Sequence, residues 1–418
     1  MRYFTYVPES IDWNEIKEKY GATYMNRMAY IVGLIAYLPT VNDEIIDDKG
    51  FVKLHAPTLK TIVGKYYLDY LKYLISDGII ETNNRYIVGK ASKGYRYTSV
   101  YTDSELIRYD FTDKHIRKKL TEARKVKEAD KKKYSYLYKW FTSGKLTIEK
   151  DAAFKFIKSH NLSEALKYSV DAIQSGIWRF KVTGEAQRLY TNLTNLKREL
   201  RQFLRYDGEE LVELDIKSSQ PYFFIKLIVV YLSGEIGQEN ALKLLSRYNG
   251  QWSPSDEEFE SFIKSFDVDL SDVASYMTMI KVGLFYPTVQ MIAKEKLGKG
   301  YPTDKQLKGA FFELAYSSNR TKTEIKTAFE DEFPIVTRIM KHYKWKDHSA
   351  LAIKLQQVES DAILNVVGKS ISKKLNRAPI YTIHDSIMTT QEHIDTVRDI
   401  MVSELEKYVG LKPIIKSK

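Results

Sequence analysis

Two aspartates, far apart in the sequence, each stand where a short apolar run meets small and polar residues. Asp215 lies near the end of the run Leu211–Ile216, and Asp385 lies between the β-rich stretches 379–383 and 386–390. The alternation predicts a strand that ends at Asp215 and a tight hairpin that presents Asp385. Two carboxylates on neighbouring strands can hold two divalent cations, which is the arrangement that phosphoryl transfer uses.

Each stretch taken alone also has an ordinary structural explanation. An aspartate at a strand end is usually a turn or cap residue, and a His-Asp pair at a hairpin tip is usually solvated. Short motifs of this kind often mislead. The residues that lie between the two stretches therefore decide whether the aspartates act together.

The composition limits the classes of protein to consider. A chain of 418 residues is expected to form two or three domains with ample cores. Cysteine is absent, which excludes disulfides, thiolate metal sites and cysteine nucleophiles and fits a reducing compartment. The sequence has no 18-residue apolar run and no hydrophobic leader, so a soluble cytoplasmic protein with no membrane partner is expected.

The charge balance indicates a possible polyanion partner. The formal net charge is +11, and 31 tyrosines accompany 65 lysines and arginines. Basic residues interleaved with aromatic residues are typical of proteins that bind nucleic acid and stack on its bases. An ordinary basic protein has the same balance, so charge alone leaves both interpretations open.

The pattern of residues 22–102 predicts a small unit of helices. Apolar positions recur there with helical spacing in three places, and the last stripe is stopped by Asp77-Gly78. The three predicted helices lie around residues 28–35, 59–63 and 67–74.

A two-stranded wing is predicted directly after these helices. Residues 79–82 and 85–88 are β-rich and are separated by the turn residues 83–84. Three short helices and a basic hairpin resemble a winged helix-turn-helix, a fold that often contacts duplex DNA. Residues 1–105 are therefore interpreted as a DNA-binding module that contacts duplex through residues 22–102. Winged helices also serve as protein-binding modules, and this alternative stays open.

A strongly basic run follows within residues 106–180. Residues 113–133 carry ten lysines and arginines against four acids, without proline or glycine, and predict helix. Such a run is usually a solvated helical face or a linker, and it can equally grip phosphates. Residues 106–180 are accordingly expected to form a basic helical region, thumb-like or linking.

Four spaced motifs carry a resemblance that covers roughly residues 180–395. They lie, in this order, at residues 188–196, 305–316, 355–363 and 384–386, with the Asp215 strand between the first two. In this order and spacing they resemble the palm and fingers of family A polymerases. That superfamily contains bacterial DNA polymerase I and the phage and mitochondrial single-subunit RNA polymerases. The resemblance implies an α+β, mostly helical right-hand domain over residues 181–418, with a small antiparallel palm sheet.

The resemblance assigns chemical roles to five residues. Asp215 and Asp385 are similar to the family's two metal-binding aspartates, and the Ile216 carbonyl is implied as a backbone ligand. The expected cofactor is two Mg²⁺ ions, with Mn²⁺ as a possible substitute. Lys308 and Tyr316, eight residues apart, match a lysine that contacts the triphosphate and an aromatic residue that lies under the incoming base and sugar.

Five further positions are implied to contact nucleic acid or the incoming nucleotide. Arg188 and Gln356 match residues that touch the template-primer, and His384 is expected near the primer-terminal phosphate. Gln220 falls where the sugar of the nucleotide is sensed, and Lys305 replaces an arginine as a weaker contact to the triphosphate.

Several positions depart from the family pattern. Asp304 stands where an arginine usually opens the lysine helix, Ser317 and Gln187 replace glycines, and Ser386 replaces the glutamate common in DNA polymerases. Gln220 replaces the glutamate that excludes a ribose 2′-hydroxyl in DNA polymerases. Ser386, Gln220 and the triplet Arg188-Leu189-Tyr190 favour ribonucleotide use.

The sequence thus predicts a template-directed nucleotidyltransferase, leaning to an RNA polymerase or primase of a phage or mobile element. Its expected partners are a DNA template with a primer or nascent RNA, and nucleoside triphosphates. A phage or plasmid origin would place it in the cytoplasm of a bacterial host. A compact family A-like DNA polymerase is the close alternative. A non-catalytic, origin-binding replication initiator and a two-metal nuclease are alternatives of other classes.

Overall fold

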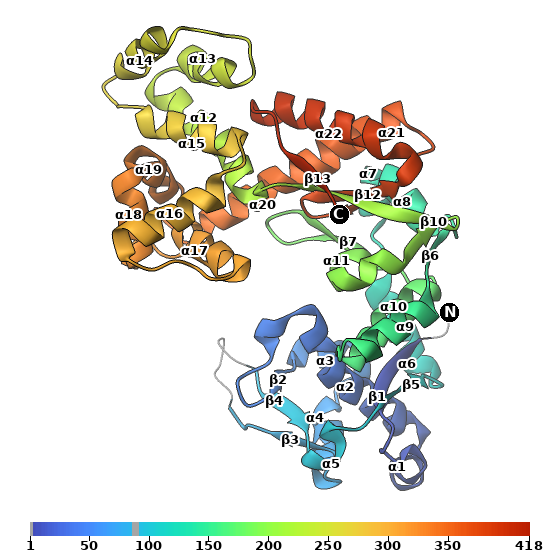
Figure 1. Cartoon of the computed structure of the whole chain (residues 1–418). Coiled ribbons are helices and arrows are strands. Elements are labelled where there is room, and N and C mark those ends of the chain that lie inside the picture. Colours follow the sequence, from blue (N-terminus) through green and yellow to red (C-terminus); the bar gives the residue numbers. More distant parts are fainter. Residues whose placement is uncertain (1–2, 86–91) are drawn as a thin grey trace. The chain divides into compact units, whose positions relative to one another are not determined.

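The computed structural model describes residues 3–85 and 92–418 and is mostly helical, with small antiparallel sheets. Contacts divide the chain into two compact units (Figure 1). Unit 1 contains Met1–Lys181 and Tyr190–Glu210, and unit 2 contains Val182–Leu189 and Leu211–Lys418. The mostly helical α+β class predicted from the sequence agrees with this architecture. In the described part of the chain, no helix is both long and apolar enough to cross a membrane.

Unit 1 begins with the helices that the three apolar stripes predict. Its N-terminal elements are β1 (Phe4–Pro8), α1 (Trp13–Tyr20), α2 (Ala22–Val41), β2 (Val52–Lys53), α3 (Ala56–Val63), α4 (Tyr67–Ser76), β3 (Ile80–Thr82), β4 (Gly94–Tyr97) and α5 (Ser99–Thr102). Helices α2, α3 and α4 confirm the predicted stripes because each buries its periodic apolar residues. Helix α4 ends at Ser76, before the predicted stop.

The described strands of the predicted wing pair around β4. Strand β3 pairs antiparallel with β4, and β4 also pairs with β2, in the order β2-β4-β3. Figure 1 shows these strands together in the blue and cyan part of the chain. The strand expected at residues 85–88 falls largely outside the described residues. The interpretation of this unit as a duplex-binding winged helix stays a prediction.

Parts of the rest of unit 1 join the hydrophobic core of these elements, within residues 111–120 and 172–177. The core cluster extends from Tyr3 to Ile177, and β1 pairs along its length with β5, from Phe4 opposite Asp110 to Pro8 opposite Leu106. The further elements are β5 (Leu106–Asp110), α6 (Lys114–Arg124), α7 (Glu128–Lys133), α8 (Ser135–Thr142), β6 (Leu146–Ile148), α9 (Lys150–Ser159), α10 (Lys167–Gln174), β7 (Phe180–Thr183), β8 (Arg188–Thr191), α11 (Asn192–Asn195) and β9 (Leu204–Tyr206). The predicted domain boundaries at residues 105 and 180 stay predictions. Residues on both sides of residue 105 pack in one core cluster.

The basic run is not one continuous helix. Helix α6 ends at Arg124, and the backbone is extended at Lys125 and Lys127 before α7 begins. Val126, between the two lysines, is buried. A β-branched apolar side chain that turns inward favours an extended segment, and this break was not visible as a proline or glycine in the sequence.

Unit 2 carries the predicted aspartates on a small antiparallel sheet. Strand β10 (Glu209–Ile216) pairs with β12 (Ser386–Thr390) and with β13 (Ile415–Ser417), and β12 pairs with β11 (Tyr381–Ile383). The strand ending near Asp215 and the hairpin around Asp385 are both confirmed. Figure 1 shows β12 and β13 next to β10.

Helices make up most of unit 2. They are α12 (Ser219–Glu235), α13 (Gln238–Tyr248), α14 (Asp256–Lys264), α15 (Ser271–Lys281), α16 (Phe285–Leu297), α17 (Asp304–Tyr316), α18 (Glu324–Glu332), α19 (Pro334–Tyr343), α20 (Ala350–Ser360), α21 (Lys369–Lys374) and α22 (Ile394–Val409). Helix α12 follows β10 and buries most of its apolar residues, which fixes the strand against the core. Helix α20 packs against α12 and continues into a π-helical segment, Asp361–Gly368. Such segments often occur at functional sites.

Candidate active site

The register of the sheet brings the two aspartates together. Asp215 lies opposite Ser386 in the β10–β12 pair, and Ser386 directly follows Asp385. Because Ile383 also pairs with Ser386, the loop between β11 and β12 is only His384-Asp385. Two residues separated by most of unit 2 in sequence therefore lie at one end of the sheet.

Near both aspartates, one residue other than glycine has a left-handed backbone conformation, which costs conformational energy. His384 has φ of 54°, and Ser218, which directly precedes α12, has φ of 53°. The left-handed region is unfavourable for residues other than glycine, and such residues gather at functional sites. This geometry ends the strand sharply on one side and the hairpin on the other.

Two carboxylates and one ammonium group act on the charge of Asp215. Burial raises the pKa of Asp215, and the nearby charges of Asp385 and Glu213 raise it further, whereas an ion pair with Lys418 opposes the shift. Two like charges this close favour a cation between them. Carboxylates and a backbone carbonyl are the oxygen donors that Mg²⁺ prefers, and Mg²⁺ usually completes its shell with water and substrate phosphates.

This donor set fits the predicted cation site. Asp215 and Asp385 are the carboxylates that would hold the ions, and the Ile216 carbonyl stays a predicted ligand. No group of three or more histidine, aspartate or glutamate side chains in ligand geometry occurs within residues 3–85 and 92–418. The assignment of Asp215 and Asp385 as metal ligands therefore stays a prediction.

Glu213 is a third carboxylate that the sequence did not single out. It is buried in β10, two residues before Asp215, and its Oε1 accepts a hydrogen bond of 2.7 Å from the Ser386 hydroxyl. A carboxylate from the neighbouring strand therefore contacts Ser386, the residue that directly follows Asp385. The signal in the sequence was the alternation that puts Glu213 and Asp215 on one face of the strand.

Glu359 links three of the predicted residues. Its Oε1 accepts from the Arg188 guanidinium and its Oε2 accepts from the Gln220 amide. The Gln220 Oε1 in turn accepts from the Tyr316 hydroxyl at 2.9 Å. Arg188, Gln220 and Tyr316 lie on three different elements, and the Glu359 side chain, which α20 positions, joins them into one chain of hydrogen bonds.

The environment of Glu359 makes its charge dependent on pH. The residue is 2% exposed, and burial raises the pKa of its carboxyl to about 7. The Arg188 guanidinium opposes this shift, and the charge of Asp385 adds to it. Gln356 lies on the same helix, and its predicted contact with nucleic acid stays a prediction. The sequence did not indicate that Glu359 would bind Arg188.

The remaining predicted residues lie around this network. Lys305 and Lys308 are exposed on α17 and form no ion pair with a carboxylate in the described part of the chain. Gln356 is half-buried on α20. His384 lines a small cavity with Arg188 and Glu359.

Aromatic residues flank the network. Phe312 stacks on Tyr316 with ring centroids 5.4 Å apart, and Phe312 is 48% exposed. Burial raises the pKa of Tyr316, and burial together with the charge of Asp385 raises the pKa of Tyr286 to about 12. Both phenols therefore keep their protons at neutral pH and remain hydrogen-bond donors.

Asp361, the first residue of the π-helical segment, has a structural role. Its carboxylate accepts from the Tyr408 hydroxyl and from the Asn365 amide, each at 2.9 Å. These two bonds tie the π-helical segment to itself and to α22. Asp361 thus stands outside the candidate site.

Comparison with known proteins identifies no family. No family model matches the sequence, and no curated protein matches it. Among solved structures, the chain is similar to the POL domain of Pol1 from M. smegmatis in complex with DNA primer-template and dNTP. The TM-score is 0.39 at 13% identity, over 65% of this chain and 55% of the other, so this chain spans about half of that structure's length. A likeness of this size carries no functional weight, and the function proposed below rests on the geometry of the residues.

Proposed function

We propose that this protein is a template-directed nucleotidyltransferase that joins nucleotides on a primed or nascent strand, with ribonucleotides used at least as well as deoxynucleotides. The observation that supports this proposal most directly is the β10–β12 register, which brings Asp215 and Asp385 together. Two divalent cations held there would lower the pKa of the attacking 3′-hydroxyl and neutralise the departing pyrophosphate.

In this proposal, the protein side chains bind and orient the substrates. Lys308, exposed on α17, contacts the triphosphate and can donate a proton to the leaving pyrophosphate. Lys305, one turn earlier, adds positive charge to the same anion. Tyr316 and the exposed ring of Phe312 offer a stacking surface for the incoming base.

Gln220 supports the preference for ribonucleotides. Its amide is held at both ends, since Oε1 accepts from Tyr316 and Nε2 donates to Glu359. One N–H and one lone pair of the amide remain for a sugar hydroxyl. A neutral, fixed amide can hydrogen-bond a 2′-hydroxyl, and a site that does so can discriminate against the sugar that lacks it.

One extension assay tests the proposal. Purified protein is mixed with a primed template, a divalent cation, and either matched NTP or matched dNTP, and single-turnover incorporation is measured. We expect Asp215→Asn and Asp385→Asn each to reduce incorporation at least about a hundredfold, because a lost cation removes several kcal/mol of transition-state stabilisation and each 1.4 kcal/mol is about tenfold.

The matched control is Asp331→Asn, which makes the same chemical change at an exposed aspartate on α18. It is expected to keep incorporation within twofold of the unmodified protein. Unchanged incorporation by either site variant, with all proteins folded by circular dichroism, would reject the site. A strong wild-type preference for dNTP would reject ribonucleotide use and favour a DNA polymerase.

A further inference from the structure

Unit 1 contains a basic pocket that lies outside the proposed catalytic site. The pocket has a volume of about 410 Å³, within the roughly 300–1,000 Å³ of small-molecule sites. Five cationic side chains line it, and no aspartate or glutamate does. The five are Arg124, Lys125, Lys127, Arg179 and Lys181.

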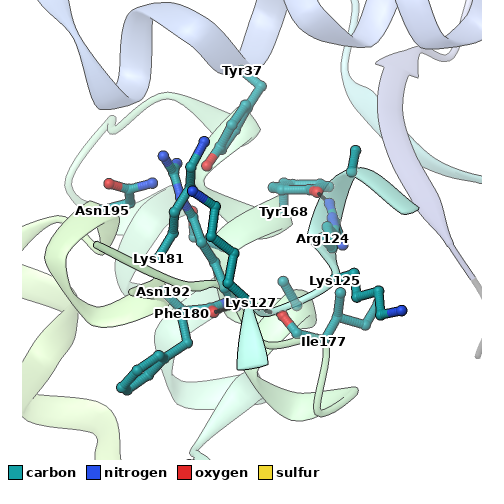
Figure 2. A pocket seen from close by; sticks show the side chains of 14 residues that line it. Tyr37, Arg124, Lys125, Lys127, Tyr168, Ile177, Phe180, Lys181, Asn192 and Asn195 are labelled. Atoms are coloured by element: carbon teal, nitrogen blue, oxygen red, sulfur yellow. Dashed lines mark hydrogen bonds between the residues drawn. The ribbon is translucent and has the colours of Figure 1, made fainter. Parts of the chain in front are cut away.

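The fold assembles these cations from two separate stretches. Arg124 is the last residue of α6, Lys125 and Lys127 come from the extended break between α6 and α7, and Lys181 comes from β7. Figure 2 shows the side chains of Lys127 and Lys181 extending toward the hydroxyl group of Tyr37, with Lys125 pointing away from them. If the basic run were one continuous helix, residues 124–127 would point to different sides of that helix and would not line one pocket in this way.

These cations have no ion-pair partner in the described part of the chain, although the charge of Lys125 acts on Glu128, which does not line the pocket. None of the five forms an ion pair with an acidic side chain among residues 3–85 and 92–418. Asp171 is a buried acid close to the pocket in sequence, because it directly precedes Ala172, which lines the pocket. Asp171 accepts a hydrogen bond from Tyr6 at 2.9 Å and pairs with Lys150 at 2.7 Å and with Arg108 at 3.1 Å. Its charge is thus already balanced, and the pocket keeps its positive potential.

The uncharged wall supplies hydrogen-bond donors and flat rings. Tyr37 and Tyr168 pack with ring centroids 4.5 Å apart, and Arg124 donates a hydrogen bond to the Tyr168 hydroxyl. Burial raises the pKa of Tyr37 to about 12, so its hydroxyl keeps its proton and can donate to an anion. Asn192 fixes the wall, because its amide accepts from the Arg179 backbone at 2.6 Å and donates to the Ile177 carbonyl at 3.0 Å.

We propose that this pocket binds the phosphate group of a nucleotide, either a free mononucleotide or a nucleotide within a nucleic-acid strand. Unpaired lysines and arginines, a protonated phenol and an acid-free wall are the features that hold phosphate oxygens. The volume exceeds what a bare phosphate needs, and the aromatic wall suits the attached nucleoside. The pocket gives Arg124, Lys125 and Lys127 of the basic run a binding role.

The test is equilibrium binding to the full chain in EDTA, which removes cation-dependent binding at the aspartates. The probes are AMP, octathymidylate and inorganic phosphate, all at one fixed ionic strength because phosphate contacts depend on salt. The pocket variant is Lys127→Gln with Lys181→Gln. The control is Lys114→Gln with Lys118→Gln, which removes the same two charges from exposed positions of α6 outside the pocket.

We expect the pocket variant to bind a nucleotide ligand at least tenfold more weakly than the control. Loss of AMP binding identifies a free mononucleotide as the ligand. Loss of octathymidylate binding, with AMP bound weakly by all three proteins, identifies a strand. A difference under threefold between the pocket variant and the control for both ligands would overturn the proposal. Inorganic phosphate bound as tightly as AMP and octathymidylate would also overturn it, because the nucleoside would then contribute nothing.

Discussion

Glu359→Gln tests whether the buried carboxylate at the centre of the network titrates near neutral pH. Burial raises the pKa of Glu359 to about 7, against an ordinary value of 4.5. That difference corresponds to about 3 kcal/mol. Glutamine has nearly the same shape and stays neutral, so it stands in for the protonated form.

The direction of the effect follows from proton binding. Between pH 4.5 and about 7 the folded protein keeps the Glu359 proton while the unfolded chain loses it. The stability that protonated Glu359 contributes is therefore fully present below its ordinary pKa of 4.5, and it is lost as the pH rises through its folded-state pKa of about 7. We expect the wild type and Glu359→Gln to be about equally stable near pH 4.5. At pH 8 the variant should be more stable by up to about 3 kcal/mol.

Urea denaturation from pH 4.5 to 8, followed by tryptophan fluorescence, measures this difference. The matched control is Glu257→Gln, the same chemical change at an exposed glutamate of α14 in the same unit. The control is expected to follow the wild type across the range. Parallel curves for the wild type and Glu359→Gln would refute the reasoning, because they would show that the carboxyl does not titrate in this window in the folded state.

Two more predictions concern neighbours of the aspartate pair. Lys418→Gln removes the ammonium group that pairs with Asp215, so Mg²⁺ no longer competes with that group for the carboxylate. Half-maximal incorporation should then need a several-fold lower Mg²⁺ concentration. An unchanged Mg²⁺ titration would contradict this competition. Gln220→Glu puts a second carboxyl group against Glu359 and changes the group that faces the sugar. Its ratio of NTP to dNTP incorporation should fall, and single-turnover rates that leave this ratio unchanged would separate Gln220 from sugar choice.

The sequence by itself determined the local elements that carry the site. Alternation fixed the strand that ends at Asp215, two β-rich runs fixed the hairpin around Asp385, and helical spacing fixed α2, α3 and α4. These features depend on which face of one short segment is buried, and periodicity within the segment records that directly. The motif spacing also grouped Asp215 with Asp385, and the sheet register brings these two residues to one end of the sheet.

Only the tertiary structure decided which side chains touch across long separations. Glu359 meets Arg188 across 171 residues and Gln220 across 139, and no local pattern distinguishes it from an ordinary helical glutamate. The break at Val126 was equally hidden, because the burial of that side chain depends on what packs against it. Short-range pattern reports the face that an element buries, whereas partners, pKa shifts and the basic pocket arise from the packing of elements against one another.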